Sequence, residues 1–315
     1  MVSQVLLVDF SADNSVRMTL AGAGERPREA RLFQCDTLDQ LGQAFDDFLK
    51  AAGNPELAGA GLSVCGWERH GAVDMPNHSY VLTRDWVKER LGISRLHLIN
   101  DCVATALAIQ RLEPSERTVI CAGHDDPTQV KAMIALGRSL GTTCIVVDEL
   151  GSPQALPGAG GYADLPATTA REFAVVEQLA AKFGHVSRVR AVSNHGLVEV
   201  FHALANIDGR PAEDLTPQDV VARSRSGDAH AAEAVSLVTG WLAATASDTA
   251  LSTGAHGGVF LAGSFFDILG DAFDTDAFVR RFRAKGRLTH YLEDISVYRM
   301  TMREPEMVGL STLFG

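Results

Sequence analysis

The sequence lacks the features that would direct it to a membrane or a nucleic acid. Its 315 residues contain no uninterrupted apolar stretch long enough to cross a bilayer, and its first residues carry no basic segment of the kind found in signal peptides. Acidic residues outnumber basic ones by 39 to 28, which gives a net charge of -11. Nucleic-acid binding needs a basic face, so we expect neither a nucleic-acid nor a membrane partner.

Cysteine is scarce and never paired in the sequence. The five cysteines are scattered, and none forms a C-x-x-C motif. An odd number of separated thiols argues against a disulfide framework and against a cysteine zinc site. The ten histidines form no H-x-x-x-H pair, so they do not signal a metal site either. We therefore expect free thiols, no protein-held metal and a cytoplasmic location.

Two familiar phosphate-binding signatures are also missing. The chain has no G-x-x-x-x-G-K-[ST] motif and no G-x-G-x-x-G fingerprint, which excludes a standard P-loop and a dinucleotide-binding unit. What remains is ordinary globular composition, with 46% hydrophobic and 21% charged residues. A chain of this length is more than one core usually fills, so two lobes are expected.

Short apolar runs alternate with amphipathic segments along most of the chain, which predicts an α/β fold with a buried sheet. Strands are expected near 5–9, 16–20, 59–65, 96–99, 118–122, 132–136, 143–147, 258–262 and 295–300. Helices are expected near 38–49, 85–91, 102–112, 276–285, at the C-terminus and repeatedly between 169 and 251. Residues 153–166 are rich in Gly and Pro and predict a loop.

The alternation of predicted strands and helices is interrupted by a polar, Pro-containing stretch around residues 113–117. We therefore predict a small α/β lobe over residues 1–112 and a large α/β lobe over residues 113–302. The C-terminal helix, residues 303–315, is expected to complete the small lobe.

A carboxylate stands at the end of one predicted strand. Residues 96–99 are followed by Asn100 and Asp101 and then by an alanine-rich helix. Ligands of open α/β sheets collect at the carboxyl ends of strands, where Asp101 could accept a proton from a substrate hydroxyl as a general base. Asp is also a favoured helix N-cap, and this segment alone favours the cap.

Two turns could meet a phosphate. The turn over residues 9–14 could offer backbone N–H groups, but it lacks glycine and carries Asp13, so an ordinary hairpin turn explains it better. The turn over residues 137–143 combines Gly, Ser and Thr with Arg138. That set suits phosphate contacts and suits a plain hairpin equally well.

Two further segments are rich in small residues. The loop over residues 156–162 either shapes a ligand cleft or only connects elements. The buried strand near residue 260 ends in Gly263 and Ser264, where the flat base of a nucleotide could pack. Close packing of the strand against a helix explains these small residues equally well.

Taken in order along the chain, these segments resemble the bacterial glucokinase family. The resemblance runs nearly from end to end, because many short blocks recur in the family's order and near its spacing. The blocks are Asp9 at the first strand, Met75-Pro76-Asn77-His78, Ile99-Asn100-Asp101, Leu156-Pro157-Gly158-x-Gly160-Gly161, Gly184-His185-Val186-Ser187, Gly196-Leu197-Val198, Gly257-Gly258-Val259-Phe260-Leu261-Ala262-Gly263 and Lys285-Gly286-Arg287.

The resemblance implies a two-lobed actin-like ATPase (ribonuclease H-like) sugar-kinase fold of the α/β class. It also implies transfer of the γ-phosphoryl group of ATP, with Mg²⁺, to the 6-hydroxyl of glucose or a related hexose. By the same resemblance Asp101 is the catalytic base, Asn100 hydrogen-bonds the sugar, and the protein is a homodimer. Phosphoryl transfer depends on positioning, charge stabilisation and an oriented base, so the resemblance favours the base over the cap for Asp101.

Both of the family's phosphate loops are eroded. The first, D-x-G-G-T-N, keeps only Asp9 and Asn14, and the Cβ atoms of Ser11 and Ala12 obstruct close approach of a phosphate. The second, G-x-G-T-G-x-G, keeps only two glycines of its pattern. The nucleotide contacts that the resemblance and the turns suggest are Asp9, Ser11, Asn14, Gly137, Ser139, Gly141, Thr142, Gly263 and Ser264.

The sugar-binding side chains of the family are also replaced. The Glu and His of its P-G-E-G-G-H block are Ala159 and Tyr162, and a further sugar-binding Glu aligns with Val189. A charge-assisted hydrogen bond contributes about 1.5–3 kcal/mol. Losing two such bonds weakens glucose binding by roughly a hundredfold to several thousandfold.

Two classes of function follow from these observations. The first is an ATP-dependent sugar kinase similar to glucokinase, acting on glucose, a related hexose or a less hydroxylated substrate. The second is a catalytically impaired pseudokinase that acts as a binding or regulatory protein, an alternative motivated by the joint erosion of the phosphate and sugar motifs.

Overall fold

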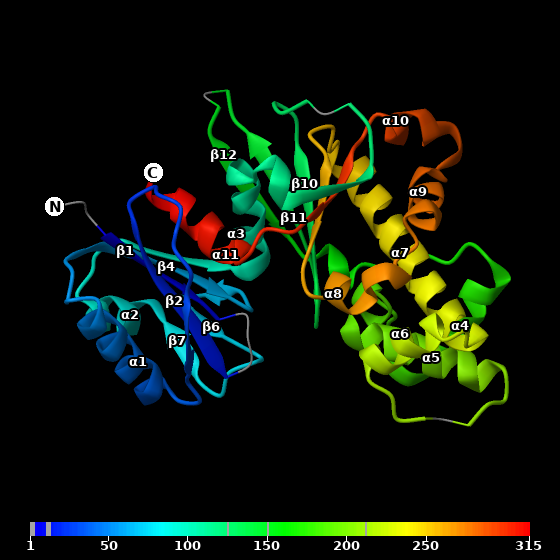
Figure 1. The fold of residues 1–315 in the computed structure, drawn as a ribbon, viewed down its shortest axis with the longest axis horizontal. Helices are drawn as coiled ribbons and strands as arrows, with labels where there is room; N and C mark the ends of the chain where they lie inside the picture. The colour runs from blue at the N-terminus through cyan, green and yellow to red at the C-terminus, as the bar shows by residue number, and fades with distance from the viewer. Residues whose placement is uncertain (1–3, 11–13, 125, 150, 212) are drawn as a thin grey trace. The chain divides into compact units, whose positions relative to one another are not determined.

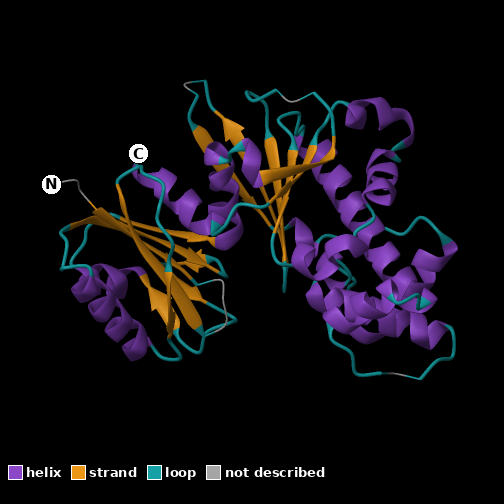
Figure 2. Cartoon of the chain, viewed as in Figure 1, coloured by secondary structure: helices purple, strands orange, loops and turns teal. Residues whose placement is uncertain are grey.

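A computed structural model of the chain describes residues 4–10, 14–124, 126–149, 151–211 and 213–315. The chain divides into two compact units. Unit 1 contains residues 1–114 and 302–315, and unit 2 contains residues 115–301. Each unit combines a sheet with helices (Figure 2), so the predicted α/β class is confirmed.

The main sheet of unit 1 has the strand order β3-β2-β1-β4-β8. Figure 1 labels its strands β1, β2 and β4. Strands β1, β4 and β8 run parallel, whereas β2 and β3 are antiparallel to their neighbours. Their bounds are β1 Gln4–Asp9, β2 Ser15–Gly22, β3 Arg31–Gln34, β4 Leu57–Val64 and β8 Leu96–Asn100. The carboxyl ends of the three parallel strands lie at one edge of the sheet, and that edge carries the polar residues after β1 and β8.

Helices cover both faces of this sheet (Figure 1). Alternate residues of a strand point to opposite faces, and β1 shows this directly. Leu6 and Val8 pack into the core shared with α1 (Leu38–Ala51) and α2 (Arg84–Leu91). Val5 and Leu7 pack into the core shared with α3 (Asp101–Leu107) and α11 (Pro305–Ser311). A strand that is apolar along its whole length is therefore buried on both sides.

The C-terminal helix α11 packs directly against α3 within unit 1. A Cβ atom added at Gly309 would lie 1.7 Å from the carbonyl oxygen of Ala104. Only glycine permits this backbone approach. The contact brings Glu306, in the first turn of α11, to the helix that begins at Asp101.

The sheet of unit 2 has the strand order β12-β11-β10-β13-β14-β9. The strands are β9 Arg117–Cys121, β10 Lys131–Leu136, β11 Leu140–Val147, β12 Pro153–Gly158, β13 Val259–Ala262 and β14 Val297–Met300. Strands β10, β13 and β14 are parallel, and the other pairs are antiparallel. The parallel strands β10 and β13 end side by side at Leu136 and Ala262, just before the two small-residue turns.

Helices α4 to α10 belong to unit 2 (Figure 1). Their bounds are α4 Ala170–Phe183, α5 Asn194–Ile207, α6 Pro217–Arg225, α7 Ala229–Thr253, α8 Phe265–Leu269, α9 Thr275–Arg283 and α10 Thr289–Glu293. The long helix α7 carries the fully buried Trp241, whose indole N–H donates to the carbonyl of Pro166 over 2.7 Å. Gly254 ends the helix in the left-handed region, with φ 66°, as predicted for a C-terminal glycine.

Several elements differ from the sequence-based expectations. The predicted loop over residues 153–166 is wrong in its first part, because residues 153–158 form the edge strand β12. Proline is tolerated on an edge strand because no neighbour needs its missing N–H group. The sequence did not predict strand β3. It also did not predict the small sheet formed by β5 (Glu68–Arg69), β6 (Ala72–Asp74) and β7 (Val81–Thr83). No helix among the described residues combines the length and the apolar character needed to cross a membrane.

Candidate active site

Asn100 and Asp101 lie at the junction of β8 and α3, at the carboxyl edge of the unit 1 sheet. Asn100 is the N-cap of α3, and its side-chain oxygen accepts from the N–H of Cys102 over 3.0 Å. Its side-chain amide donates to the carbonyl of Gly66 over 3.2 Å. The capping role that the sequence suggested for Asp101 therefore belongs to Asn100. Asp101 is the first residue of the helix, and it is half-buried.

The surroundings of Asp101 suit a general base. The pKa of Asp101 is raised to about 6, chiefly by burial. The N–H of Cys102 opposes the rise by donating to the carboxylate over 2.8 Å, and the nearby charge of Asp9 adds to it. A carboxylate with this pKa is mostly ionised at neutral pH and is a stronger proton acceptor than an ordinary aspartate. Burial also raises the pKa of the Cys65 thiol to about 12, with Asp101 and Asp9 adding to the effect, so that thiol stays protonated.

Asp9 is fully buried and forms an ion pair with Arg17. The antiparallel pairing of β1 and β2 sets these two residues directly opposite each other. The Nη2 and Nε atoms of Arg17 donate to Oδ2 of Asp9 over 2.6 and 3.1 Å. Arg17 also reaches Glu306 at 3.8 Å and Glu304 at 4.0 Å. We call Asp9, Asp101, Glu304 and Glu306 the carboxylate cluster of unit 1.

Carboxylates are the side chains that hold Mg²⁺ in proteins, so the cluster tests whether this chain fits the ion that the resemblance implies. Asp9 is closed off from solvent, and its charge is already neutralised by a guanidinium with two hydrogen bonds. Burial alone would lower the pKa of Arg17, but Asp9, Glu306 and Glu304 hold it above its ordinary value. The arginine is therefore a permanent cation, and the arrangement at Asp9 does not fit a protein-bound Mg²⁺.

The first phosphate loop is described only at its ends. Ser11 lies outside the described residues. Asn14 adopts a left-handed conformation with φ 47°, and its N–H donates to the carbonyl of Asn77. The side-chain amide of Asn77 donates in turn to the carbonyl of Phe10 over 2.8 Å. The Met-Pro-Asn-His block thus holds both ends of the loop, a role that the sequence did not reveal.

The second loop meets the exit of β13 within unit 2. A Cβ atom at Gly137 would lie 3.3 Å from Oγ of Ser264, and one at Gly263 would lie 1.9 Å from the carbonyl oxygen of Leu136. Gly263 also has φ 111°, which side chains rarely adopt. The backbone of Gly137 and the hydroxyl of Ser264 therefore lie close together at the carboxyl ends of two parallel strands, and the Gly137 N–H donates to the carbonyl of Ser139 over 3.0 Å. Such an edge fits a phosphate-bearing ligand.

Two predicted nucleotide contacts, Thr142 and Gly141, also make contacts within the fold. Thr142 is buried, and its hydroxyl accepts from the N–H of Gly160 over 2.9 Å, so it fixes the Pro-Gly segment. Gly141 lies within strand β11, paired with Ala135. Residues 137–141 also fit a G-x-S-x-G pattern, which the sequence reasoning missed. They join two antiparallel strands rather than a strand and a helix, so they do not form a nucleophile elbow.

The two segments that replace the sugar-binding blocks are held together in unit 2. The carbonyl of Tyr162 lies 3.1 Å from Nε2 of His185, and Asp164 pairs with Ser187 in an isolated β-bridge. Ala159 is exposed, and the Tyr162 side chain is 63% exposed. The structure therefore brings the Ala159 and Tyr162 loop next to the segment that carries Val189.

Val189 itself packs against the helical core, which is where a valine is stable. Beside it Arg188 forms an ion pair with Asp248 over 3.1 Å, and Lys285 pairs with the same carboxylate. The Gly-His-Val-Ser and Lys-Gly-Arg blocks pointed to these segments, but not to the pairing on Asp248. Charged side chains therefore lie next to the segment from which the family's sugar-binding glutamate is missing.

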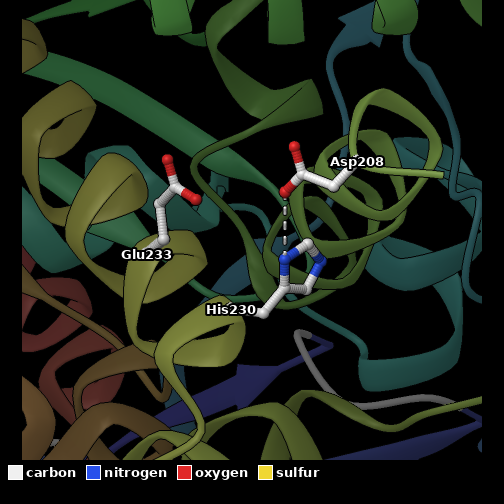
Figure 3. Close-up of side chains that lie close together, drawn as sticks. All are labelled: Asp208, His230 and Glu233. Atoms are coloured by element: carbon white, nitrogen blue, oxygen red, sulfur yellow. Dashed lines mark ion pairs between the residues drawn. The ribbon is translucent and has the colours of Figure 1, made fainter. Parts of the chain in front are cut away.

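A separate group in unit 2 has the residue types of a metal site. One ligand atom from each of Asp208, His230 and Glu233 lies within 4.8 Å of the others (Figure 3). However, Arg171 donates to both oxygens of Asp208 over 2.7 and 2.9 Å and to both oxygens of Glu233 over 2.8 and 2.9 Å. A guanidinium therefore already satisfies both carboxylates, and the group ties α4, α5 and α7 together.

A cavity of about 400 Å³ is lined by His124, Asp126, Gln129, His256 and Asp294. Asp126 and Gln129 precede β10, His256 precedes β13 and Asp294 precedes β14. His124 follows the antiparallel strand β9. The cavity thus lies at the amino ends of the parallel strands, away from the edge at which α/β sheets bind their ligands.

Glu306 provides a test of the cluster's electrostatics. Its pKa is raised to about 8, chiefly by burial and then by the charge of Asp9. Arg17 opposes this rise, and Asp101 contributes to it. Between the ordinary carboxyl pKa and pH 8 the folded chain thus binds a proton that the unfolded chain has lost, so stability falls as pH rises. Glu306→Gln should remove this contribution. The free energy of unfolding should then fall less steeply between pH 6 and 8, by up to about 1.4 kcal/mol per pH unit.

Urea unfolding at several pH values measures this slope. Glu56→Gln, at an exposed position of the same unit, serves as the control and should leave the slope unchanged. An unaltered slope in Glu306→Gln would show that Glu306 is ionised in the folded chain at neutral pH.

Comparison with known proteins extends over nearly the whole chain. The sequence profile of the glucokinase family matches residues 12–315. A glucokinase from Aromatoleum aromaticum is 32% identical over 312 residues, which cover 98% of this chain and 93% of the relative. The crystal structure of a glucokinase from an Antarctic psychrotroph superposes with a TM-score of 0.87 at 23% identity, covering 100% of this chain and 99% of that one. A ROK family glucokinase from Streptomyces griseus, solved with glucose and AMPPNP, gives a TM-score of 0.64 at 17% identity, covering 99% of each chain.

Proposed function

Because the chain belongs to the glucokinase family, we propose that it transfers the γ-phosphoryl group of ATP to a hydroxyl of a hexose, with Asp101 as the general base. The observation that carries the proposal is the placement of Asp101 at the carboxyl end of β8, half-buried, with a pKa raised to about 6. Asn100 holds the start of the same helix, so it fixes the position from which the carboxylate acts.

In the proposed reaction Asp101 accepts the proton of the sugar 6-hydroxyl while that oxygen attacks the γ-phosphorus. The bond between the γ-phosphorus and the bridging oxygen breaks, and ADP leaves with the bond's electron pair. The base is needed because a neutral hydroxyl is a weak nucleophile. We assign Asn100 to a hydrogen bond with the sugar, as the resemblance implies.

We propose that unit 2 contacts the phosphates of ATP through Gly137, Ser139, Gly263 and Ser264. Their convergence at the ends of β10 and β13 supports this assignment. The Streptomyces griseus structure, which contains AMPPNP, supports the class of nucleotide. Mg²⁺ is implied by the family alone. Because Arg17 already neutralises Asp9, no step of the proposed reaction is assigned to that ion.

The substrate is proposed to be a sugar, and the replaced residues predict weak affinity for glucose. Ala159 is exposed, with φ -115° and ψ 35°, so it can accept a longer side chain. The double variant Ala159→Glu and Tyr162→His should bind glucose about 10- to 100-fold more tightly, because each new side chain offers hydrogen bonds to sugar hydroxyls. Isothermal titration calorimetry with glucose measures the gain.

Leu156→Glu, on the exposed side of the neighbouring strand, is the matched control for added charge and should leave the glucose affinity unchanged. If the double variant binds glucose no better than the parent chain, these two positions do not face the sugar. A substrate with fewer hydroxyls then becomes the better candidate.

The proposed function is tested by measuring ADP release in the presence of glucose, other hexoses and amino sugars. The comparisons support the kinase over the pseudokinase, since relatives of this chain that match along nearly its whole length are glucokinases. Calorimetry with MgATP separates the two, because a kinase must bind nucleotide. A folded chain that neither binds MgATP nor phosphorylates any of the sugars would favour the binding or regulatory role.

We further propose a cytoplasmic homodimer without a nucleic-acid partner. The five cysteines are free, which suits a reducing compartment, and the net charge of -11 disfavours a phosphate backbone. The homodimer rests on analogy with the family, and light scattering during gel filtration measures it directly.

A further inference from the structure

We propose that the Arg17 guanidinium takes the place of a divalent cation in the carboxylate cluster of unit 1, so that the chain carries its own counter-ion at Asp9. The inference deepens the proposed function and rests on it only for the catalytic role of Asp101. It concerns the same edge of the sheet, but it can be tested without nucleotide, sugar or turnover.

The sheet register places Arg17 for this role. Alternation along β1 puts Asp9 on the same face as Val5 and Leu7, toward α3 and α11. Arg17 stands directly opposite Asp9 on β2 and therefore emerges on that face. Its side chain is 28% exposed, whereas the Asp9 side chain is completely buried. A buried carboxylate that lost this partner would remain as an uncompensated charge.

The guanidinium lies close to more than one carboxyl group. It donates twice to Asp9 and lies within 4.0 Å of both Glu304 and Glu306. Oxygen atoms from several carboxylates around one positive centre are the usual surroundings of a hard divalent cation. In this chain the positive centre is a side chain fixed in the sheet.

A neutral oxygen beside Asp9 completes the comparison with a cation site. Ser63 on β4 pairs in register with Asp9 and is fully buried. Its Oγ atom has no hydrogen-bond partner among the described residues. Removal of Arg17 would leave the oxygens of Asp9, Glu304, Glu306 and Ser63 as possible ligands, a set that suits Mg²⁺ or Mn²⁺.

In unit 2 a second arginine also neutralises a group of carboxylates. Arg171 binds Asp208 and Glu233 with four hydrogen bonds of 2.7 to 2.9 Å, in a group that otherwise has the composition of a metal site. The planar fork of arginine matches carboxylate oxygens, and its charge does not depend on pH in the physiological range. Arginine therefore neutralises a carboxylate group in each of the two units.

The experiment measures binding of Mn²⁺ alone, by electron paramagnetic resonance of the free ion and by thermal shift, in the full chain without nucleotide or sugar. Arg17→Met should bind one Mn²⁺ at least tenfold more tightly than the parent chain. Its Tm should rise by about 5 °C or more at saturating Mn²⁺, whereas the Tm of the parent chain should not change. Adding Glu306→Gln to Arg17→Met should weaken this binding.

Arg31→Met on the neighbouring strand is the matched control, because Arg31 stacks on Phe33 and Phe48 and has no ion pair with the cluster. It should bind Mn²⁺ no better than the parent chain. An Arg17→Met chain that folds only with Mn²⁺ would support the inference, and one that stays unfolded with Mn²⁺ would overturn it. Tight Mn²⁺ binding by the parent chain that Asp9→Asn abolishes would also overturn it. Lack of kinase activity would leave these outcomes unaffected.

Discussion

Replacing Asp101 with Asn is expected to lower kcat for phosphoryl transfer by roughly 100- to 10,000-fold, the range associated with loss of a general base. Asparagine keeps the size of the side chain and can still accept from the N–H of Cys102, which lies 2.8 Å from the carboxylate. It cannot take the proton of the sugar hydroxyl. The loss should therefore appear in kcat more than in the KM for the sugar.

The stability of this variant separates catalysis from folding. Because burial raises the pKa of Asp101 to about 6, its ionisation destabilises the folded chain above that pH. Asp101→Asn should thus be at least as stable as the parent chain at pH 8, measured by urea unfolding. Asp85→Asn, in the exposed first turn of α2, is the matched control and should keep full activity. Equal losses in both variants would mean that Asp101 has no special role.

Replacing Gly309 with Ala is expected to lower the free energy of unfolding by about 3 kcal/mol. The new Cβ atom would lie 1.7 Å from the carbonyl oxygen of Ala104 and 2.8 Å from its carbon. These are backbone atoms of α3, so α11 must move as a whole to relieve the clash. Chemical unfolding in urea measures the loss, and activity should fall with it, because α3 begins at Asp101.

The control is Gly240→Ala in the interior of α7, where nothing lies within 4 Å of the added Cβ atom. Alanine is the better helix former, so this variant should gain about 0.5–1 kcal/mol. The two substitutions are chemically identical and differ only in their surroundings. A Gly309→Ala chain as stable as Gly240→Ala would show that α11 does not pack on α3 as described.

The sequence was sufficient for features that are local in the chain. The strand from Leu96, followed by Asn100 and a helix, appeared as expected, because strand length and the capping preference are encoded in neighbouring residues. The same holds for α7 and its terminal Gly254. The family resemblance and the α/β sugar-kinase fold are confirmed by the profile match and by the superposed glucokinase.

What the sequence could not supply depends on register and on contacts between distant segments. The Asp9 to Arg17 pair follows from the exact pairing of β1 with β2, and a one-residue slip would turn Arg17 to the other face. Glu306 joins the cluster only because α11 packs on α3, about 200 residues earlier in the chain. Nothing local to Thr142 indicates that its hydroxyl accepts a hydrogen bond from the N–H of Gly160.

The roles proposed for the site residues rest on geometry. The structure places Asp101 at a strand end and gathers Gly137 and Ser264 at another, within separate units. Val189, which the resemblance aligns with a sugar-binding Glu, packs against the helical core.

The most direct test of the central claim is transfer of labelled phosphate from γ-³²P-ATP to a sugar, with the products separated and counted. The account predicts that the parent chain forms labelled sugar phosphate and ADP in equal amounts, and that Asp101→Asn forms almost none. Absence of labelled sugar from a folded parent chain, across glucose, other hexoses and amino sugars, would contradict it.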